Sequence, residues 1–322
     1  MNRRELLAAA PLAGLAAALP AGRALAQAAR AEPRAQPLAG AQRFRLGERS
    51  VVALLDGALR IEPAMLQGID AEGYAEALEA AFRDPETYRS PVNAFAIEGG
   101  EGIVLVDAGA GEAMGSGFGR VLANLEAAGH APEDVATLLV THLHPDHIGG
   151  ALRGGEPVFP NAEVVVSAAD VAFWTDAATR AAAPAEAAPF FDLAAAFVAA
   201  YGDRLREIEG EAEAAPGVTA MPLPGHTPGH TGFRIDEGDR RLLLWADVVH
   251  VPPVQFARPS VAIAFDTDPA QAAETRARLL DQAAADRLLV AGAHMEFPGV
   301  AQIERAGEGF RAVPAVYDYP QG

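Results

Sequence analysis

The sequence predicts an α/β fold in which helices cover sheets of mainly buried strands. Five runs of continuous apolar residues have the character of such strands, and they occupy residues 102–107, 135–141, 162–167, 241–246 and 287–291. Segments with helical spacing alternate with these runs, near residues 73–82, 116–128, 169–176, 190–202 and 269–284. Because a strand buried on both faces reads as an unbroken apolar run, this alternation indicates sheets with helices outside them.

Residues 142–147, His-Leu-His-Pro-Asp-His, follow the second apolar run and place three imidazoles and a carboxylate within six positions. Imidazole nitrogen and carboxylate oxygen are ligands that suit zinc and neighbouring first-row metals. His142 and His144 share one face of an extended segment, so both can bind one ion. The proline that follows turns the chain and can direct Asp146 and His147 to a second position. The segment therefore predicts a metal-binding loop at the end of a strand.

More ligand-type residues occur downstream, in a turn or after an apolar run. The loop 221–231 is rich in glycine and proline and carries His226 and His230. Such a turn fixes a side chain without support from a helix or strand. Asp247 follows the fourth apolar run, and His294 follows the fifth. These positions predict the remainder of the metal site.

In this order, the motifs resemble those of the metallo-β-lactamase superfamily of dinuclear metal hydrolases. The resemblance is carried by the His-x-His-x-Asp-His run, the Gly-His-Thr-Pro-Gly-His loop, Asp247 and His294. Residues 102–109 also resemble the opening strand and Asp-x-Gly turn of that superfamily. The resemblance extends from about Arg43 to the end of the chain, and it implies a four-layer αβ/βα sandwich.

The resemblance also implies a role for each motif residue. One metal ion is expected to bind His142, His144 and His226, and a second is expected to bind Asp146, His147 and His294. Asp247 would bridge the two ions. His230 would be a supporting residue, with a plain loop position as the alternative, while Asp107 and Thr141 would orient imidazoles. The expected cofactor is two divalent metal ions, zinc by default, because manganese, cobalt and iron accept the same donors.

The implied activity is hydrolysis of a small neutral ester. Two neighbouring cations lower the pKa of a shared water towards ~7 and polarise the substrate's phosphoryl or carbonyl oxygen, so that a metal-bound hydroxide attacks. Asp146 or Asp247 could pass a proton to the leaving group. An iron-dependent oxygenase of the superfamily, which commonly uses a single iron, is the alternative from another class. The full set of seven expected ligands favours two metals.

Three segments point to a subgroup, because residues 247–260, residues 264–271 and the pair Phe173-Trp174 resemble the methyl parathion hydrolase group. This likeness favours a phosphotriester of the organophosphate type as the substrate. Quorum-quenching lactonases typically place a tyrosine three residues after the bridging aspartate, and this chain has His250 there. Hydrolysis of a lactone or an aryl ester is the alternative.

Apolar side chains are expected to line the substrate pocket. Trp174 and Phe191 fall between the second and third motifs, where this fold usually covers the metal site, and they could bracket an aryl group. Packing in the core is the alternative, since the phenylalanines of this segment have helical spacing. His250 and Met114, which follows the turn at Asp107, are further pocket candidates.

Residues 1–26 predict a signal peptide. Arginines at positions 3 and 4 precede an Ala/Leu-rich stretch, as in signals of the twin-arginine type, and Ala24 and Ala26 provide the small residues that a signal peptidase reads. The apolar stretch is short and interrupted by proline and glycine, whereas a membrane span needs ~20 apolar residues. A periplasmic or secreted protein without stable membrane insertion is therefore expected, with a transmembrane anchor as the alternative.

Residues 27–42 are rich in alanine, proline and arginine and predict a flexible linker, and residues 43–322 predict a single hydrolase domain. The chain has no lysine, and its 25 arginines face 43 acidic residues, for a formal net charge of -18. This balance disfavours nucleic acid and anionic lipid as partners and fits a neutral substrate. A homodimer is one expected assembly, because relatives commonly dimerise, although no residue pattern locates an interface.

Overall fold

The computed structural model describes residues 39–315, so the predicted signal peptide and residues 27–38 of the predicted linker lie outside the described residues. Two seven-stranded sheets form the centre of the described part. In order of neighbours, the first sheet contains β1 (Ala41–Leu46), β2 (Arg49–Arg60), β4 (Arg89–Gly100), β5 (Gly102–Val106), β6 (Val135–Leu139), β9 (Glu163–Ser167) and β10 (Leu205–Ile208). The second contains β11 (Ala212–Ala215), β12 (Val218–Pro222), β13 (Thr231–Glu237), β14 (Arg240–Ala246), β16 (Leu289–Gly292), β17 (Val300–Ala306) and β18 (Gly309–Pro314).

Both sheets combine parallel and antiparallel pairs. In the first sheet, β5, β6, β9 and β10 run parallel to one another. In the second, β14 and β16 are parallel neighbours, whereas the strands on either side of them pair antiparallel. Parallel neighbours end at the same edge of a sheet. The residues that follow β14 and β16 therefore lie beside each other.

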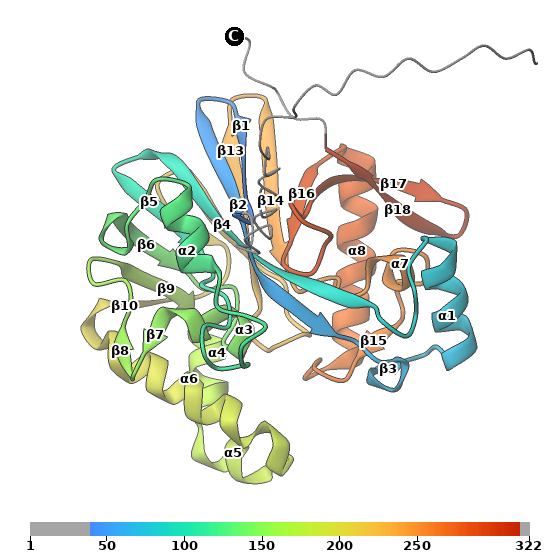
Figure 1. The fold of residues 1–322 in the computed structure, drawn as a ribbon, viewed down its shortest axis with the longest axis horizontal. Coiled ribbons are helices and arrows are strands. Elements are labelled where there is room, and N and C mark those ends of the chain that lie inside the picture. The colour runs from blue at the N-terminus through green and yellow to red at the C-terminus, as the bar shows by residue number, and fades with distance from the viewer. Residues whose placement is uncertain (1–38, 316–322) are drawn as a thin grey trace, which may run out of the picture. The chain divides into compact units, whose positions relative to one another are not determined.

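The core has three layers of side chains, because each sheet is buried on both faces. In β2, Val51 and Ala53 pack between the two sheets, whereas Val52 and Leu54 pack on the outer side of the first sheet. Helices α2 (Val121–Ala127), α4 (Ala168–Thr175) and α6 (Ala188–Tyr201) cover that outer side, and α8 (Pro269–Asp286) covers the second sheet (Figure 1). This arrangement confirms the predicted α/β class and the four-layer αβ/βα sandwich.

Smaller elements complete the described chain. A fourth apolar cluster joins α1 (Ala71–Ala80) and α7 (Pro252–Gln255) to the short pair β3 (Leu66–Gln67) and β15 (Ala262–Ile263). The other short elements are α3 (Pro145–Ile148), α5 (Ala177–Ala182), β7 (Leu152–Arg153), β8 (Glu156–Pro157) and five single-turn 3-10 helices at Pro63–Met65, Pro132–Asp134, Gly149–Ala151, Ala185–Ala187 and Gly202–Arg204. Within residues 39–315, every helix is too short or too polar to cross a membrane.

Two predicted boundaries are wrong. Strand β1 includes residues 41 and 42, which the sequence assigns to the linker, because they pair with β2. The helix predicted from residue 116 begins at Val121, since Gly115 and Gly119 adopt left-handed φ angles of 85° and 84°. Asp56 of β2 accepts hydrogen bonds from the N–H groups of Gly119, Arg120 and Val121, so the start of α2 is capped by a residue from a distant strand.

Candidate metal centre

The ligand-type residues come from four chain segments that meet at one edge of the two sheets. The loop after β6 carries His142 and His144, and α3 carries Asp146 and His147. Pro145 occupies the first position of α3, where its missing N–H costs nothing. The loop between β12 and β13 supplies His226, and the residues after β14 and β16 supply Asp247 and His294.

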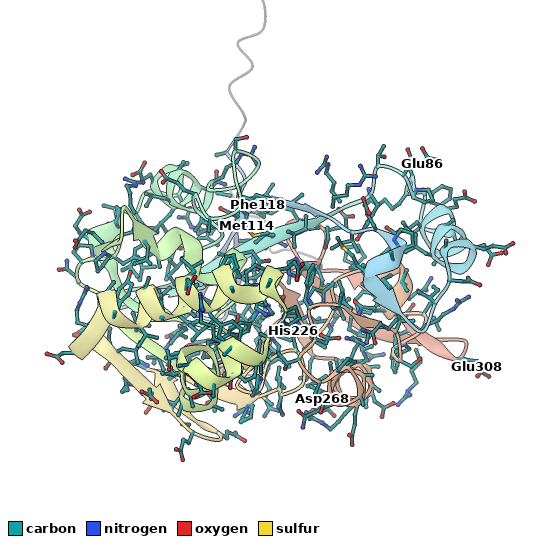
Figure 2. All side chains as sticks on the ribbon, turned by 90° about the horizontal axis from the view of Figure 1, so that it is seen from below. Glu86, Met114, Phe118, His226, Asp268 and Glu308 are labelled. Atoms are coloured by element: carbon teal, nitrogen blue, oxygen red, sulfur yellow. The ribbon has the colours of Figure 1, made fainter. Side chains whose placement is uncertain are left out.

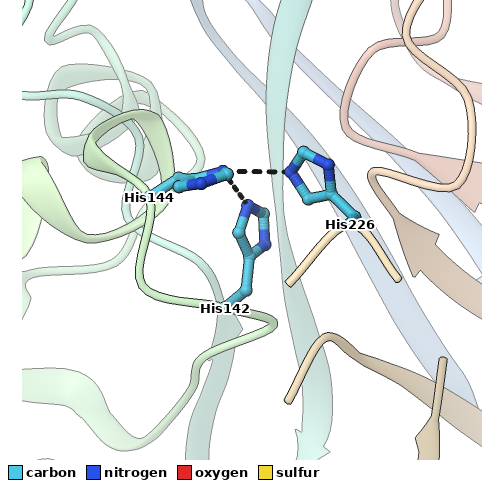
Figure 3. A group of neighbouring side chains, drawn as sticks. All are labelled: His142, His144 and His226. Atoms are coloured by element: carbon cyan, nitrogen blue, oxygen red, sulfur yellow. Dashed lines mark hydrogen bonds between the residues drawn. The ribbon is translucent and has the colours of Figure 1, made fainter. Parts of the chain in front are cut away.

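Three imidazoles meet at one point of this site, as Figure 3 shows. His144 Nδ1 lies 3.0 Å from His142 Nε2 and 3.0 Å from His226 Nε2. All three rings are buried, and their facing nitrogens are close enough to bind a single ion. Burial holds the pKa of His142 and of His144 well below the ordinary value. Both rings are therefore neutral, which is the form that binds a metal.

A second group of ligand atoms lies beside the first. Asp146 Oδ2 lies 3.6 Å from His147 Nε2 and 3.5 Å from His294 Nε2. Burial disfavours a charged imidazole, but the carboxylates of Asp247, Asp146 and Asp107 outweigh it and raise the pKa of His147 well above the ordinary value. The surroundings of His147 thus stabilise positive charge, which a divalent cation would supply.

Asp247 lies between the two groups. Its Oδ2 lies 3.3 Å from His226 Nε2 and 3.0 Å from His294 Nε2, and its Oδ1 lies 3.2 Å from His147 Nε2. Two of these buried atoms, Asp247 Oδ1 and His147 Nε2, have no hydrogen-bond partner. Buried polar atoms are rarely left without a partner, so this donor set fits a pair of cations with Asp247 between them.

The predicted supporting residues contact the Nδ1 atoms of the imidazoles, on the side of each ring away from the metal centre. Asp107 accepts hydrogen bonds from Thr141 Oγ1 at 2.9 Å and from His147 Nδ1 at 2.8 Å, and Thr141 Oγ1 lies 3.0 Å from His142 Nδ1. His294 Nδ1 donates to the carbonyl oxygen of Pro91 at 2.8 Å. When Nδ1–H donates a hydrogen bond in this way, the unprotonated Nε2 of the same ring is free to bind a metal.

His230 is buried and supports Asp247 without joining the ligand atoms. Its Nδ1 donates to the carbonyl oxygen of Leu223 at 2.9 Å, and its Nε2 accepts the Asp247 N–H at 3.2 Å. Both ring nitrogens are therefore occupied by protein partners. This geometry favours the supporting position over the plain loop position.

The four residues predicted for the substrate pocket lie in different surroundings. Trp174 is buried, and its ring forms an edge-to-face pair with that of His144 at a centroid distance of 5.1 Å. The Phe191 ring packs against Trp174 at 4.7 Å. Phe191 is buried in the same apolar cluster as Trp174, which favours the core alternative for it. Met114 lies on a half-buried turn, away from the central position of His226 in Figure 2.

His250, predicted for the substrate pocket, lies among the ligand atoms. Its Nε2 is 3.1 Å from Asp247 Oδ2, and its side chain is 1% exposed. The rings of His226 and His294 both lie 4.8 Å from it. The resemblance placed His250 at the position of the lactonase tyrosine, three residues after Asp247, but did not predict its contacts with the rings of His226 and His294.

Two buried carboxylates escaped the sequence reasoning. Asp266 Oδ1 accepts a hydrogen bond from His226 Nδ1 at 2.9 Å. Asp170 of α4 accepts the N–H groups of Leu143 at 3.0 Å and of Gly229 at 2.7 Å. Each aspartate therefore supports a loop that carries ligands. Asp266 lies in the segment 264–271, which the sequence linked only to a subgroup, and Asp170 lies in no motif.

A family model described as Metallo-beta-lactamase superfamily matches residues 87–294. In sequence, the chain is 28% identical over 165 residues to an N-acyl homoserine lactonase of Bacillus sp, a match that covers 45% of this chain and 58% of that protein. It is 28% identical over 125 residues to an N-acyl homoserine lactonase of Bacillus cereus, with 39% and 42% covered. The chain thus spans about half the length of these curated relatives.

Two solved structures match nearly all of the described fold. The crystal structure of hydrolase AbOPH in the beta lactamase superfamily has a TM-score of 0.83 and 32% identity, and the match covers 88% of this chain and 99% of that chain. AidC, a dizinc quorum-quenching lactonase in complex with the product N-hexanoyl-L-homoserine, has a TM-score of 0.81 and 25% identity over the same shares of the two chains.

Proposed function

Because this chain belongs to the metallo-β-lactamase superfamily and is a metal-dependent hydrolase, we propose that it opens the ester ring of N-acyl homoserine lactones at a centre of two divalent cations. The observation that carries the proposal is the position of Asp247, whose two oxygens reach imidazoles of both ligand groups. The similarity to N-acyl homoserine lactonases and to AidC supports a lactone as the substrate.

We assign the two ligand groups to the two cations. One cation would bind His142 Nε2, His144 Nδ1 and His226 Nε2, the other would bind Asp146, His147 and His294, and Asp247 would bind both. Zinc suits this mixture of nitrogen and oxygen donors, and the similar structure AidC is a dizinc enzyme. Manganese, cobalt and iron accept the same donors, so the native metal is settled by elemental analysis of the purified protein.

When bound, two such cations lower the pKa of a coordinated water and polarise the ester carbonyl. The protein residues supply the geometry. Oxygen partners on Nδ1 fix the rings of His142, His147, His226 and His294, so that Nε2 faces the centre in each. Asp146 is 8% exposed and Asp247 is 2% exposed. We therefore propose that Asp146, on the more open side, passes the proton to the leaving oxygen, while Asp247 holds the two ligand groups together.

A phosphotriester is the second candidate substrate, because residues 247–260 resemble the methyl parathion hydrolase group and His250 replaces the tyrosine typical of lactonases. Both substrates need the same metal centre, and they differ in the atom that is attacked, which is carbon in the lactone and phosphorus in the phosphotriester. The relatives found in sequence are lactonases, which favours the lactone. The oxygenase alternative differs in its metal content, because it requires one iron per chain.

The deciding experiment compares N-hexanoyl homoserine lactone with a dimethyl aryl phosphotriester, using the zinc-loaded protein. We expect a higher kcat/KM for the lactone, and we expect Asp247→Ala to abolish it. Asp236→Ala, which removes an exposed carboxylate of β13, is the matched control and should retain activity. A preference for the phosphotriester would overturn the substrate assignment, and one iron per chain would overturn the dinuclear centre.

We also propose that the chain is exported to the periplasm or secreted, on the support of residues 1–26 alone. Replacement of the arginines at positions 3 and 4 by lysine should retain the protein in the cytoplasm if the twin-arginine prediction is right. Cell fractionation with immunoblotting measures this directly. Export at the normal level in that variant would contradict the twin-arginine type.

A further inference from the structure

His250 is held firmly at the metal centre, although it comes from the loop after β14 and not from a ligand motif. Its N–H donates to Gln255 Oε1 at 2.6 Å, and its carbonyl oxygen accepts Ser90 Oγ at 2.6 Å. Its ring stacks on that of His294 with an interplanar angle of 20°. The backbone and the ring therefore direct Nε2 toward Asp247.

The distances around Asp247 Oδ2 match those between ligands of one ion. His250 Nε2 lies 3.1 Å from this oxygen, between the values of 3.0 Å for His294 Nε2 and 3.3 Å for His226 Nε2. Two donors that each lie ~2.0–2.1 Å from a zinc ion, at angles from ~90° to ~109°, are about 2.9–3.4 Å apart. His250 thus has the same spacing to this oxygen as His294 and His226, and it lies closer than His142 Nε2, which is 3.7 Å away.

Neither ring nitrogen of His250 makes an aligned hydrogen bond, although both are buried. Nε2 contacts Asp247 Oδ2 at 3.1 Å, and Nδ1 has no aligned partner. Buried polar atoms are rarely left without a partner, because the lost hydrogen bond to water is not replaced, so such atoms indicate a group that binds there. His230 provides the contrast, because it is equally buried in the same site but has a hydrogen bond at each ring nitrogen.

We propose that His250 is an additional metal-binding side chain, whose Nε2 binds the cation shared by His226 and Asp247. The ligand atoms of these three residues lie within 4.8 Å of one another. The centre would then have eight metal-binding side chains in place of the seven that the family motifs supply. The proposal rests on the two-cation centre of the proposed function, but it is independent of which ester is the substrate.

Cadmium-113 NMR of the wild-type protein tests this without a variant. Scalar coupling between cadmium and the ring protons of each bound histidine gives a cross-peak for that histidine. Five cross-peaks are expected from the assigned ligands, which are His142, His144, His147, His226 and His294. Binding by His250 would add a sixth cross-peak. Six histidines support the proposal and five overturn it. Failure to bind two cadmium ions would instead contradict the dinuclear centre itself, so the two failures are distinguishable.

A variant then assigns the additional signal. His250→Phe keeps a ring between His226 and His294 but removes both nitrogens, so it should lose one histidine signal and weaken one of two zinc sites on the order of tenfold or more. His130→Phe, at a partly buried position paired with Glu98, is the matched control and should change neither. An unchanged histidine count and zinc affinity in a folded His250→Phe protein would overturn the proposal. If that variant does not fold, the number of cadmium-bound histidines in the wild-type protein tests the proposal by itself.

Discussion

Asp266 Oδ1 lies 2.9 Å from His226 Nδ1, so a carboxylate from the loop before α8 orients a ligand that comes from the loop after β12. The other oxygen of Asp266 accepts the N–H of Ile263 at 3.0 Å. The fully buried guanidinium of Arg276 lies 3.9 Å from that oxygen and donates to the carbonyl oxygen of Val248, the residue after Asp247. One network therefore joins His226 to the segment that carries Asp247.

We predict that Asp266→Ala weakens metal binding by about 10–100-fold, because residues that orient metal-bound histidines have effects of this size. The measurement is a competition titration of zinc against a chelator. Asp268→Ala is the control, because Asp268 caps α8 by accepting the Gln271 N–H, and its loss should cost about 1 kcal/mol of stability without a change in zinc affinity. Equal zinc affinities in the two variants would contradict the role of Asp266.

Asp170 joins the two loops that carry histidine ligands, because its carboxylate accepts a hydrogen bond from each of them. Its side chain is fully buried, and the Leu143 N–H that it binds lies between His142 and His144. The Gly229 N–H on its other oxygen comes from the loop of His226. Gly229 passes so close to α4 that a Cβ atom there would lie 2.5 Å from the backbone nitrogen of Asp170.

We predict that Asp170→Ala lowers the free energy of unfolding by about 2–6 kcal/mol, since two buried N–H groups lose their acceptor and each costs about 1–3 kcal/mol. Urea denaturation of the zinc-loaded protein measures the loss. Asp176→Ala, which removes the exposed cap of α5, should cost only about 1 kcal/mol. If Asp170→Ala lost no more unfolding free energy than the control, the two hydrogen bonds of Asp170 would be unimportant for stability.

The sequence predicted β5, β6, β9, β14 and β16, because these strands are buried and read as apolar runs, but it did not predict β2, which is also buried on both faces. It missed β4, whose Pro91 and Asn93 read as turn residues. Both have a purpose in the folded protein, because Pro91 accepts a hydrogen bond from His294 and Asn93 donates to the carbonyl oxygens of Gly292 and Met295. The backbone carbonyl of Pro91 and the side chain of Asn93 therefore support the loop that carries a metal ligand.

The same reasoning explains which site residues could be predicted. The motif histidines and Asp247 follow strands or lie in a distinctive turn, so local patterns reveal them. Asp266 is 40 residues from His226 and follows no apolar run. Its partner is determined only when the chain folds. His250 also has neighbours from other segments, including Ser90, His226 and His294, so its resemblance to the lactonase tyrosine position predicted a place at the substrate but not these contacts.

Phe191 and Met114 differ sharply in packing, although the sequence predicts both for the pocket. Phe191 is 3% exposed and lies in the cluster beneath α4 and α6, whereas Met114 lies on a half-buried turn. We predict that Phe191→Ala costs about 3–5 kcal/mol of stability through the cavity that it leaves. Met114→Ala should cost much less. Urea denaturation compares the two variants, and a similar loss for both would contradict the core position of Phe191.

The Glu98 carboxylate links stability to pH at a distance from the metal ligands. It accepts hydrogen bonds from Arg43 Nη2 at 2.7 Å and lies 2.6 Å from His130 Nε2. Burial alone would raise its pKa, but hydrogen bonds and charges from Arg43 and His130 hold the pKa below the ordinary value of 4.5. The folded protein therefore binds this proton more weakly than the unfolded chain does.

It follows that Glu98 stabilises the fold above pH 4.5 and that this contribution disappears as the pH falls through the lowered pKa. We predict that Glu98→Gln is less stable than the wild type by up to about 1 kcal/mol near pH 6, and that the gap closes toward pH ~3. Urea denaturation of both proteins at each pH measures the gap, and the subtraction removes effects of metal loss that both share. Glu62→Gln, whose exposed partner is Arg60, should show almost no gap at any pH, because both side chains of that pair are more than half exposed. A gap for Glu98→Gln that stays constant as the pH falls would mean that shape, and not charge, makes Glu98 stabilising.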